Sequence, residues 1–296
     1  MRILHLDAGK EMRGGQWQVL RLIQGLDRQG AECLLLARPE SPLFEMARQA
    51  RLAVEPLSFR NVLMLGRRCD LMHAHDARSH TLGALAASVS GPLLIVARRV
   101  AFPVGSRWKY GRARCYVAVS EYVKSVLVAG GVPHHKIAVV PDGVPLLEPA
   151  RGSALLAPAN SSDPQKGAPL AIAAARLAGM PLEFSANLEP DLRDAGLFLY
   201  ITHNEGLGSA ALLAMSAALP VIASNVGGLR EVIRHCHNGM LVENSADTIA
   251  AAIREVAQNP ALARRLGDAA RQTVQERFTV DIMVRRTLAV YHEVLS

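Results

Sequence analysis

The chain has 296 residues, of which 50% are hydrophobic, and this is enough to form the cores of two modest domains. With 33 Lys and Arg residues against 26 Asp and Glu residues, the net charge is +7, which favours anionic partners. No apolar run reaches the roughly 18 residues of a membrane span, and the four cysteines lack the paired spacing of a metal site. We therefore expect a cytoplasmic protein of a reducing compartment, in which residues 1–7 form a first strand rather than a signal peptide.

Apolar runs alternate with helical segments in the first half of the chain, which predicts a parallel sheet covered on both faces. The predicted strands are residues 2–6, 32–37, 52–57, 70–76, 93–97, 115–119 and 137–144, the last running into a turn. The predicted helices are 16–29, one that begins at Ser41-Pro42, 78–90, and one capped by Ser120.

Residues 145–165 are rich in Pro, Ser and Ala, which predicts a hinge between two domains. The strands expected beyond it are 197–201 and 221–224. The expected helices are 168–178, 209–219, one from Ser245 or Asp247 to 259, one that ends near 278, and a last one over 280–295.

Residues 202–209 join a predicted strand to a predicted helix and contain Glu205, Gly206 and Gly208. A glycine loop that opens a helix is suited to phosphate, because backbone N–H groups and the helix dipole favour an anion there. A carboxylate would repel that phosphate, so we expect Glu205 to accept hydrogen bonds from sugar hydroxyls. The alternative is a tight turn with a solvated Glu205.

Several motifs occur in a fixed order along the chain. In the second half they are residues 205–209, 214–215, 220–224, 227–233 and 238–242. In the first half they are Gly14-Gly15, residues 73–76, 118–124 and 137–144. Together these motifs resemble those of the family 4 retaining glycosyltransferases of GT-B type, and the first group resembles that family's donor site.

The resemblance implies an α/β fold of GT-B type, with two Rossmann-like domains whose parallel sheets face each other across a cleft. We expect an acceptor-side domain over residues 1–147, a donor-binding domain over 148–280, and a terminal helix, 281–296, that packs back on the first domain. Only the 30 residues 167–196 separate Lys166 from the strand at 197, so the second domain is expected to be trimmed.

The family's donor site has two glutamates separated by seven residues. Glu205 matches the first, as a candidate catalytic residue, whereas Leu213 stands where the family's second glutamate holds the nucleotide ribose. Lys166-Gly167 matches the family's pair for donor phosphates, but the arginine that usually precedes it is missing from residues 157–162. The donor-binding residues implied are Lys166, Gly206, Leu207, Gly208, Ser209 and Leu213.

The resemblance also implies acceptor-side residues in the first half. Gly14, Gly15 and Arg99 are expected in the acceptor-side loop, and His75 and Arg98 are the other candidate catalytic residues. His73 and His75 share one face of a strand and could bind a metal together with Asp76. Because no further ligand set is evident in the sequence, we expect no metal.

Residues 98–114 contain six basic residues, no acidic one, and the aromatic residues Phe102, Trp108 and Tyr110. This basic segment has several interpretations: a cleft loop that binds an anionic acceptor, a contact with an acidic bilayer, or a solvated loop. Nucleic-acid binding by phosphate contacts and stacking is the least favoured of these interpretations, and we expect no nucleic-acid partner.

Other catalytic templates are missing from the sequence, including a G-x-S-x-G elbow, a Walker A loop and a G-x-G-x-x-G fingerprint after the first strand. The prediction is therefore a glycosyltransferase that moves a sugar from a nucleotide-diphosphate sugar to a glycan or lipid-linked acceptor, with retention of configuration and without a cofactor. Its expected setting is cell-surface polysaccharide or glycolipid synthesis, with peripheral contact to the inner face of the membrane. The alternative is a degenerate, catalytically weak protein that binds sugar nucleotides or glycans.

Overall fold

A computed structural model describes residues 1–90, 92–159 and 166–296. The chain divides into two compact units, the first made of Met1–Gly143 with Val280–Ser296 and the second of Val144–Thr279. The first boundary thus lies at 143/144, where the sequence predicted 147/148. Among the described helices, none combines the length and the hydropathy needed to cross a membrane.

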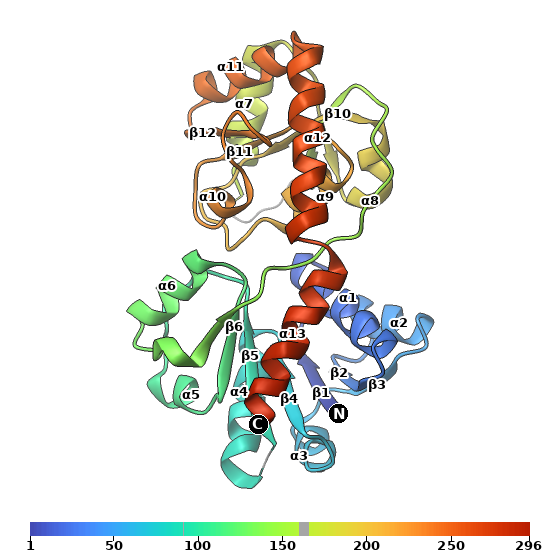
Figure 1. Ribbon diagram of the computed structural model, residues 1–296, viewed down its shortest axis with the longest axis vertical. Coiled ribbons are helices and arrows are strands. Elements are labelled where there is room, and N and C mark those ends of the chain that lie inside the picture. The colour runs from blue at the N-terminus through green and yellow to red at the C-terminus, as the bar shows by residue number, and fades with distance from the viewer. Residues whose placement is uncertain (91, 160–165) are drawn as a thin grey trace. The chain divides into compact units, whose positions relative to one another are not determined.

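The first unit contains a seven-stranded parallel sheet with the order β3-β2-β1-β4-β5-β6-β7 (Figure 1). Its strands are β1 (Arg2–Asp7), β2 (Glu32–Ala37), β3 (Ala53–Pro56), β4 (Leu71–Ala74), β5 (Leu93–Arg98), β6 (Cys115–Ala118) and β7 (Ile137–Val139). The central strands β4 and β6 are buried along their whole length, as the predicted continuous apolar runs require.

Helices connect the strands of this unit. They are α1 (Gly14–Arg28), α2 (Pro42–Gln49), α3 (Phe59–Gly66), α4 (Ala77–Ser90), α5 (Arg107–Gly111) and α6 (Glu121–Ala129), with the 3-10 turn η1 (His134–Lys136). Ser41 and Ser120 cap α2 and α6 through their side chains, as their positions in the sequence predicted. The sequence did not predict α5, which lies inside the basic segment.

The terminal helix α13 (Val280–Leu295) belongs to the first unit and packs against α1. Its residues Met283, Val284 and Tyr291 share one hydrophobic core with Leu22 and Leu26 of α1. The two helices come so close that a Cβ added to Gly25 would lie 2.3 Å from Val284 Cγ2.

The second unit contains a five-stranded parallel sheet with the order β12-β11-β10-β8-β9. Its strands are β8 (Ala154–Pro158), β9 (Leu182–Ser185), β10 (Ala195–Tyr200), β11 (Val221–Ser224) and β12 (Met240–Val242). Its helices are α7 (Ala168–Ala178), α8 (Leu188–Asp191), α9 (Ser209–Ser216), α10 (Leu229–Val232), α11 (Ala246–Ala257) and α12 (Pro260–Arg277), with the 3-10 turn η2 (Leu192–Asp194).

The predicted hinge over 145–165 is wrong for residues 154–158, which form β8 between β10 and β9. Leu155 and Leu156 are 1% and 4% exposed, so this short run lies in the core of the second unit. The surrounding Pro and Ser residues obscured a five-residue strand, which is too short to show a clear period. The part of the hinge at 160–165 lies outside the described residues.

Candidate functional site

The loop that follows β10 brings together the residues predicted to bind the donor. Lys166 forms an isolated antiparallel bridge with Thr202, and the Gly167 N–H donates to the Ile201 carbonyl over 3.0 Å. A Cβ on Gly167 would lie 2.7 Å from Ile201 Cγ2, so this close approach requires glycine. These contacts hold Lys166 beside the loop although 39 residues separate it from Glu205.

Glu205 is held by three groups. Lys166 Nζ lies 3.1 Å from its Oε2, the Tyr200 hydroxyl donates to the same oxygen, and the Gly206 N–H donates to Oε1 over 3.0 Å. Burial, together with the Glu205 carboxylate, raises the pKa of Tyr200 well above its ordinary value, so the hydroxyl remains a donor. The side chain of Lys166 is 40% exposed and that of Glu205 is 16% exposed. An ammonium and a carboxylate therefore share one partly open position at the end of the strand.

The two predicted glycine loops pack on each other. The Gly228 N–H donates to the Glu205 carbonyl over 3.0 Å, and a Cβ on Gly228 would lie 2.0 Å from the Gly206 oxygen. Gly208 precedes α9 with φ +103°, a left-handed conformation that favours glycine. α9 then begins at Ser209 with no acidic residue in its first turn, so its positive dipole end is not neutralised by its own side chains.

Leu207 and Leu213 form an apolar part of this region. They are 2% and 6% exposed, and Leu213 lies one turn beyond Ser209 on α9. A leucine at this position has no hydrogen-bonding group, so the site lacks the acceptor that the second family glutamate would supply. The structure thus brings Lys166, Glu205, Gly206, Gly208 and Ser209 into one region and places a buried apolar side chain at position 213.

In the first unit, Arg99 is the arginine that lies at the predicted acceptor loop. Its Nε donates to Asp142 Oδ1 over 3.2 Å, and its Nη1 lies 3.5 Å from His75 Nδ1. A Cβ on Gly15 would lie 4.0 Å from Arg99 Cδ, whereas one on Gly14 would meet no described atom within 4 Å. The backbone at Gly14 and Gly15 is therefore open, with Arg99 next to it.

Arg98 has different partners from Arg99. Its guanidinium donates to the Phe102 carbonyl and lies over the Tyr110 ring, 5.8 Å from the centroid. Successive side chains of a strand point to opposite sides, which explains why Arg98, the last residue of β5, and Arg99 do not share partners. Within the described residues, Arg98 contacts the basic segment rather than Gly15 or His75.

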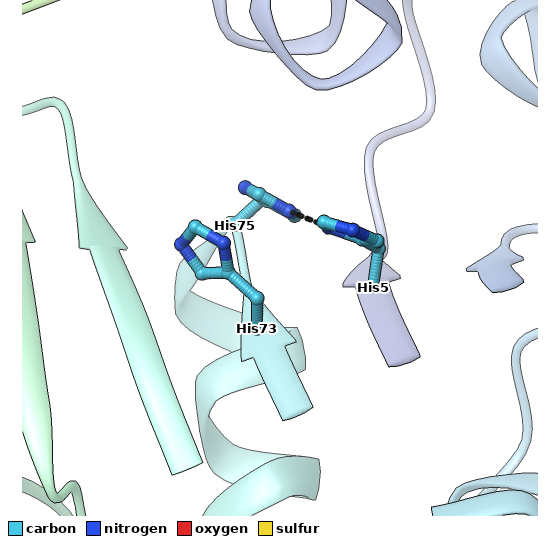
Figure 2. Close-up of side chains that lie close together, drawn as sticks. All are labelled: His5, His73 and His75. Atoms are coloured by element: carbon cyan, nitrogen blue, oxygen red, sulfur yellow. Dashed lines mark hydrogen bonds between the residues drawn. The ribbon is translucent and has the colours of Figure 1, made fainter. Parts of the chain in front are cut away.

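His75 is 6% exposed, and both of its ring nitrogens face protein groups. Figure 2 shows its Nε2 pointing to His5 Nδ1, at 3.0 Å. A guanidinium can only donate, so His75 Nδ1 accepts from Arg99 and His75 Nε2 carries the hydrogen donated to His5. His75 therefore orients Arg99, and both ring nitrogens of His75 are used in contacts with other protein groups.

Two carboxylates, Asp7 and Asp76, end the strands beside these histidines. Asp7 Oδ1 accepts from the Gly9 N–H over 2.8 Å, and Asp76 accepts from the N–H groups of Ala8 and Arg78. Burial, with the nearby Asp76, raises the pKa of Asp7 to about 6. Asp76, which the sequence grouped with His73 and His75, instead holds the backbone of the loop and of α4.

Four residues of these regions were missed by sequence reasoning: Asp7, Asp142, Tyr200 and His5. Asp7 and Tyr200 end β1 and β10, close to the ends of the predicted strands 2–6 and 197–201, where ligands of open α/β sheets usually bind, and this signal could have identified them. Asp142 and His5 act through partners 43 and 70 residues away, which only the fold brings near.

The basic segment combines cations with exposed aromatic side chains. Phe102 and Trp108 are 56% and 45% exposed, and Arg112 lies over the Trp108 ring, 5.8 Å from its centroid. Tyr110 is buried and stacks on Tyr116, which anchors α5 to β6. The segment is therefore a fixed, partly helical structure with an outward apolar and cationic surface.

Comparison with known proteins covers both units. Residues 12–147 match the family model described as Glycosyltransferase Family 4, and residues 184–273 match Glycosyl transferases group 1. N-acetyl-alpha-D-glucosaminyl L-malate synthase of Bacillus anthracis is 32% identical over 110 residues, which are 37% of this chain and 29% of that protein. D-inositol 3-phosphate glycosyltransferase of Streptomyces coelicolor is 36% identical over 100 residues, which are 33% and 22% of the two chains. The aligned stretches thus span less than a third of these relatives.

Solved structures share the fold over the whole chain. Anabaena HepE in complex with UDP and glucose has a TM-score of 0.87 at 16% identity, covering 98% of this chain and 99% of that one. Sucrose-phosphate synthase of Thermosynechococcus elongatus has a TM-score of 0.81 at 17% identity, covering 99% and 98%. The family assignment rests on three findings, which are the two parallel-sheet α/β domains, these structural neighbours and the two family models. The chain belongs to the family 4 glycosyltransferases and has the GT-B fold.

Proposed function

We propose that the protein transfers a sugar, with retention of configuration, from a nucleotide-diphosphate sugar to a glycan or lipid-linked acceptor. The observation that carries this proposal is the pairing of Lys166 with Glu205 at the start of α9. One site there offers a cation for a diphosphate and a carboxylate for sugar hydroxyls, which are the two parts of such a donor.

In the proposed reaction, the bond between the anomeric carbon and the diphosphate breaks, the acceptor hydroxyl oxygen bonds to that carbon, and the hydroxyl proton passes to the leaving diphosphate, on whose oxygens negative charge grows. The Lys166 side chain is 40% exposed, so its ammonium can turn from Glu205 to this leaving group. The N-terminus of α9, behind Gly208, adds its dipole. Fixed positive groups placed where charge develops lower the barrier more than they stabilise the bound donor.

Glu205 is proposed to bind the sugar of the donor. Its Oε2 is fixed by the Tyr200 hydroxyl, so the carboxylate keeps one orientation when Lys166 turns away. Hydrogen bonds from sugar hydroxyls to this carboxylate would orient the anomeric carbon for attack. In this proposal the protein supplies no nucleophile and the transfer uses no cofactor.

The acceptor is proposed to bind the first unit at Gly14 and Gly15, with Arg99 as its charged contact. Asp142 and His75 hold the guanidinium of Arg99 in place. Arg98, in contrast, is proposed to hold the basic segment through Phe102 and Tyr110. Phe102 and Trp108 on that segment give it the composition of a peripheral contact with an acidic membrane at the inner face.

The names of similar proteins support the donor class and the setting. Anabaena HepE was crystallised in complex with UDP-glucose, and another neighbour with a TM-score of 0.74 is the lipopolysaccharide outer core galactosyltransferase WaaB. We therefore place a UDP-sugar first among the donors and cell-surface polysaccharide or glycolipid synthesis first among the settings.

A second candidate function rests on Leu213. Without a carboxylate at this position, a chain of this family could bind sugar nucleotides or glycans weakly and turn over little. The distinction between the two functions lies in turnover and not in the fold.

The test is transfer itself, followed by proton NMR with UDP-glucose and other nucleotide sugars in the presence of candidate acceptors. The proposal expects a product whose new anomeric centre has the configuration of the donor. Inversion of configuration would contradict the proposed mechanism. Nucleotide binding without turnover of any donor would favour the degenerate function instead.

A further inference from the structure

Three histidines of the first unit lie together at the ends of β1 and β4 (Figure 2). The register of the two strands sets His5 opposite His73, and His75 follows at the end of β4. One nitrogen from each ring can be chosen so that all three lie within 4.8 Å of one another. We propose that His5, His73 and His75 bind one divalent transition-metal cation, such as zinc.

The distances suit such an ion after a small movement. Tetrahedral zinc with Zn–N bonds of about 2.0–2.1 Å places its ligand nitrogens roughly 3.3 Å apart. His5 Nδ1 and His75 Nε2 are already 3.0 Å apart. Bringing the third nitrogen in from at most 4.8 Å needs a shift of roughly 1.5 Å, which turning a side chain can supply.

His73 has a free buried nitrogen that could ligate a metal, whereas His75 would have to move its hydrogen from Nε2 to Nδ1, so that the metal replaces its hydrogen bonds to His5 and Arg99. The rings of His5, His73 and His75 are 0%, 1% and 6% exposed. His5 Nε2 and His73 Nε2 are buried and have no hydrogen-bond partner among the described residues. Buried polar atoms are normally paired, so the unpaired His73 Nε2 beside the His5–His75 pair calls for a ligand.

The residues around the cluster also suit a cation. The Tyr291 hydroxyl lies 2.6 Å from His73 Nδ1, and metal-binding histidines usually have such a partner on the second nitrogen. Arg99 opposes a cation, since its Nη1 is 3.5 Å from His75 Nδ1, but Asp142 is ion-paired with it. Asp7 and Asp76 add two further carboxylates near these strand ends.

The proposed ion would join β1 and β4 and, through Tyr291, the terminal helix α13. It would thus stabilise the first unit and takes no part in the proposed transfer. The sequence grouped His73 and His75 with Asp76, but that carboxylate is engaged with backbone N–H groups. The structure supplies His5 as the third ligand in its place.

The test uses the full-length protein, stripped with a chelator, desalted and titrated with Co²⁺. The proposal expects one tightly held Co²⁺ per chain, with the intense visible absorption of a four-coordinate site, and its displacement by one equivalent of Zn²⁺. Metal content after gel filtration, measured by mass spectrometry, gives the stoichiometry. A native chain that retains no metal would show that the His5–His75 hydrogen bond alone explains the cluster, and would overturn the proposal.

Variants locate the ion. His5→Gln is expected to weaken cobalt binding by about 100-fold or more, and Tyr291→Phe, which keeps every ligand, by about 10-fold. The matched control is His134→Gln, an exposed histidine of the same unit, which should leave binding unchanged. If a folded His5→Gln chain keeps the metal and His134→Gln loses it, the metal binds at the surface. That result would contradict the proposed site. If His5→Gln does not fold, the affinity of Tyr291→Phe for cobalt and the metal stoichiometry of the native chain still test the proposed site.

Discussion

The ammonium of Lys166 lies 3.1 Å from the Glu205 carboxylate in a partly open position. The two charges could therefore bind a ligand, or they could only pair with each other. A surface pair of this kind contributes little to stability, about 0–1 kcal/mol. Ordering the two long side chains costs conformational entropy, and a ligand that contacts both groups explains better why they are held together. The two residues should therefore affect donor chemistry far more than folding.

Replacing Lys166 with alanine should lower kcat for sugar transfer by about 100- to 1,000-fold, because a positive group that faces the leaving diphosphate is lost. The melting temperature should change little. Initial rates with a saturating donor measure the effect. Lys124→Ala is the matched control, since Lys124 forms a comparable lysine–glutamate pair with Glu121 at 3.7 Å on α6. Equal losses in both variants would contradict the assigned role of Lys166.

At position 213, a glutamate should restore the missing acceptor for the ribose. A hydrogen bond to a charged group contributes about 1.5–3 kcal/mol, and partial burial of the new carboxylate offsets some of it. We expect Leu213→Glu to tighten UDP binding by about 10-fold in calorimetry, and Leu213→Gln to tighten it less. A folded Leu213→Glu chain with unchanged affinity would show that the ribose does not bind beside α9.

At the scale of elements, α1 and α13 approach each other through Gly25. A glycine in a helix interior normally costs about 1 kcal/mol relative to alanine, so a glycine kept there implies a steric reason. A Cβ at this position would lie 2.3 Å from Val284 Cγ2, and the branched valine can turn only slightly.

Gly25→Ala should therefore lower the free energy of unfolding by about 1–3 kcal/mol, as overpacking does. Adding Val284→Ala should recover part of the loss, because the second change makes room for the new methyl group. Gly14→Ala, at a position on α1 where a Cβ meets no described atom within 4 Å, is the control. Urea denaturation of the native chain, Gly25→Ala, Val284→Ala, the double variant and the Gly14→Ala control gives the comparison. Full additivity of the two single effects would mean that α1 and α13 do not touch at this point.

A buried histidine on α4 gives the first unit a dependence on pH. His80 is 2% exposed, and its ring meets those of Tyr110 and Tyr116 edge-on. Burial, helped by Lys109, lowers the pKa of His80 from 6.5 to about 4. Between these values the unfolded chain binds the proton and the folded chain does not, so stability falls as the pH falls from 6.5 towards 4.

Replacing this residue with an apolar ring removes that dependence. At pH 5 we expect His80→Phe to retain about 2 kcal/mol more of its neutral-pH stability than the native chain does. His134→Phe, at an exposed position, should behave like the native chain. Denaturation curves at pH 7 and pH 5 measure the difference. Parallel losses in the native chain and His80→Phe would mean that His80 does not titrate in this window.

The elements of this fold differ in how well the sequence predicts them. The apolar run predicted at 197–201, most of which lies in β10, and helices with a capping serine such as α6, were predictable because burial and capping leave local patterns. β8, β9 and β12 were missed, because strands of three to five residues carry no clear period, whereas β11, which is as short, was predicted from its place between a helix and a glycine loop.

The same division holds for the candidate sites. Lys166, Glu205 and the glycine loops followed from motifs, whereas Tyr200 on Glu205 and Asp142 on Arg99 depend on contacts that only the folded chain creates. Arg98 and Arg99 show that position in the sequence alone does not predict which side chain reaches a site. They are neighbours in sequence, yet only Arg99 lies next to Gly15.

At the scale of the whole molecule, the chain has two Rossmann-like units, and each carries a separate group of candidate residues. The central claim concerns the second unit, where Lys166, Glu205 and the start of α9 are proposed to bind a nucleotide-diphosphate sugar. If donor binding fails, the proposed transfer fails with it, whereas the fold and the proposed histidine site would be unaffected.

The most direct test is a thermal-shift screen of the native chain and Lys166→Ala against UDP, GDP, ADP, CMP and their common sugar conjugates. A ligand that binds only the folded state stabilises it by about 2.7 kcal/mol at 100 times its Kd, and the melting temperature rises accordingly. We expect a clear rise for one nucleotide, UDP first, and a smaller rise in Lys166→Ala. A cooperative melt that no ligand shifts at millimolar concentration would contradict this expectation.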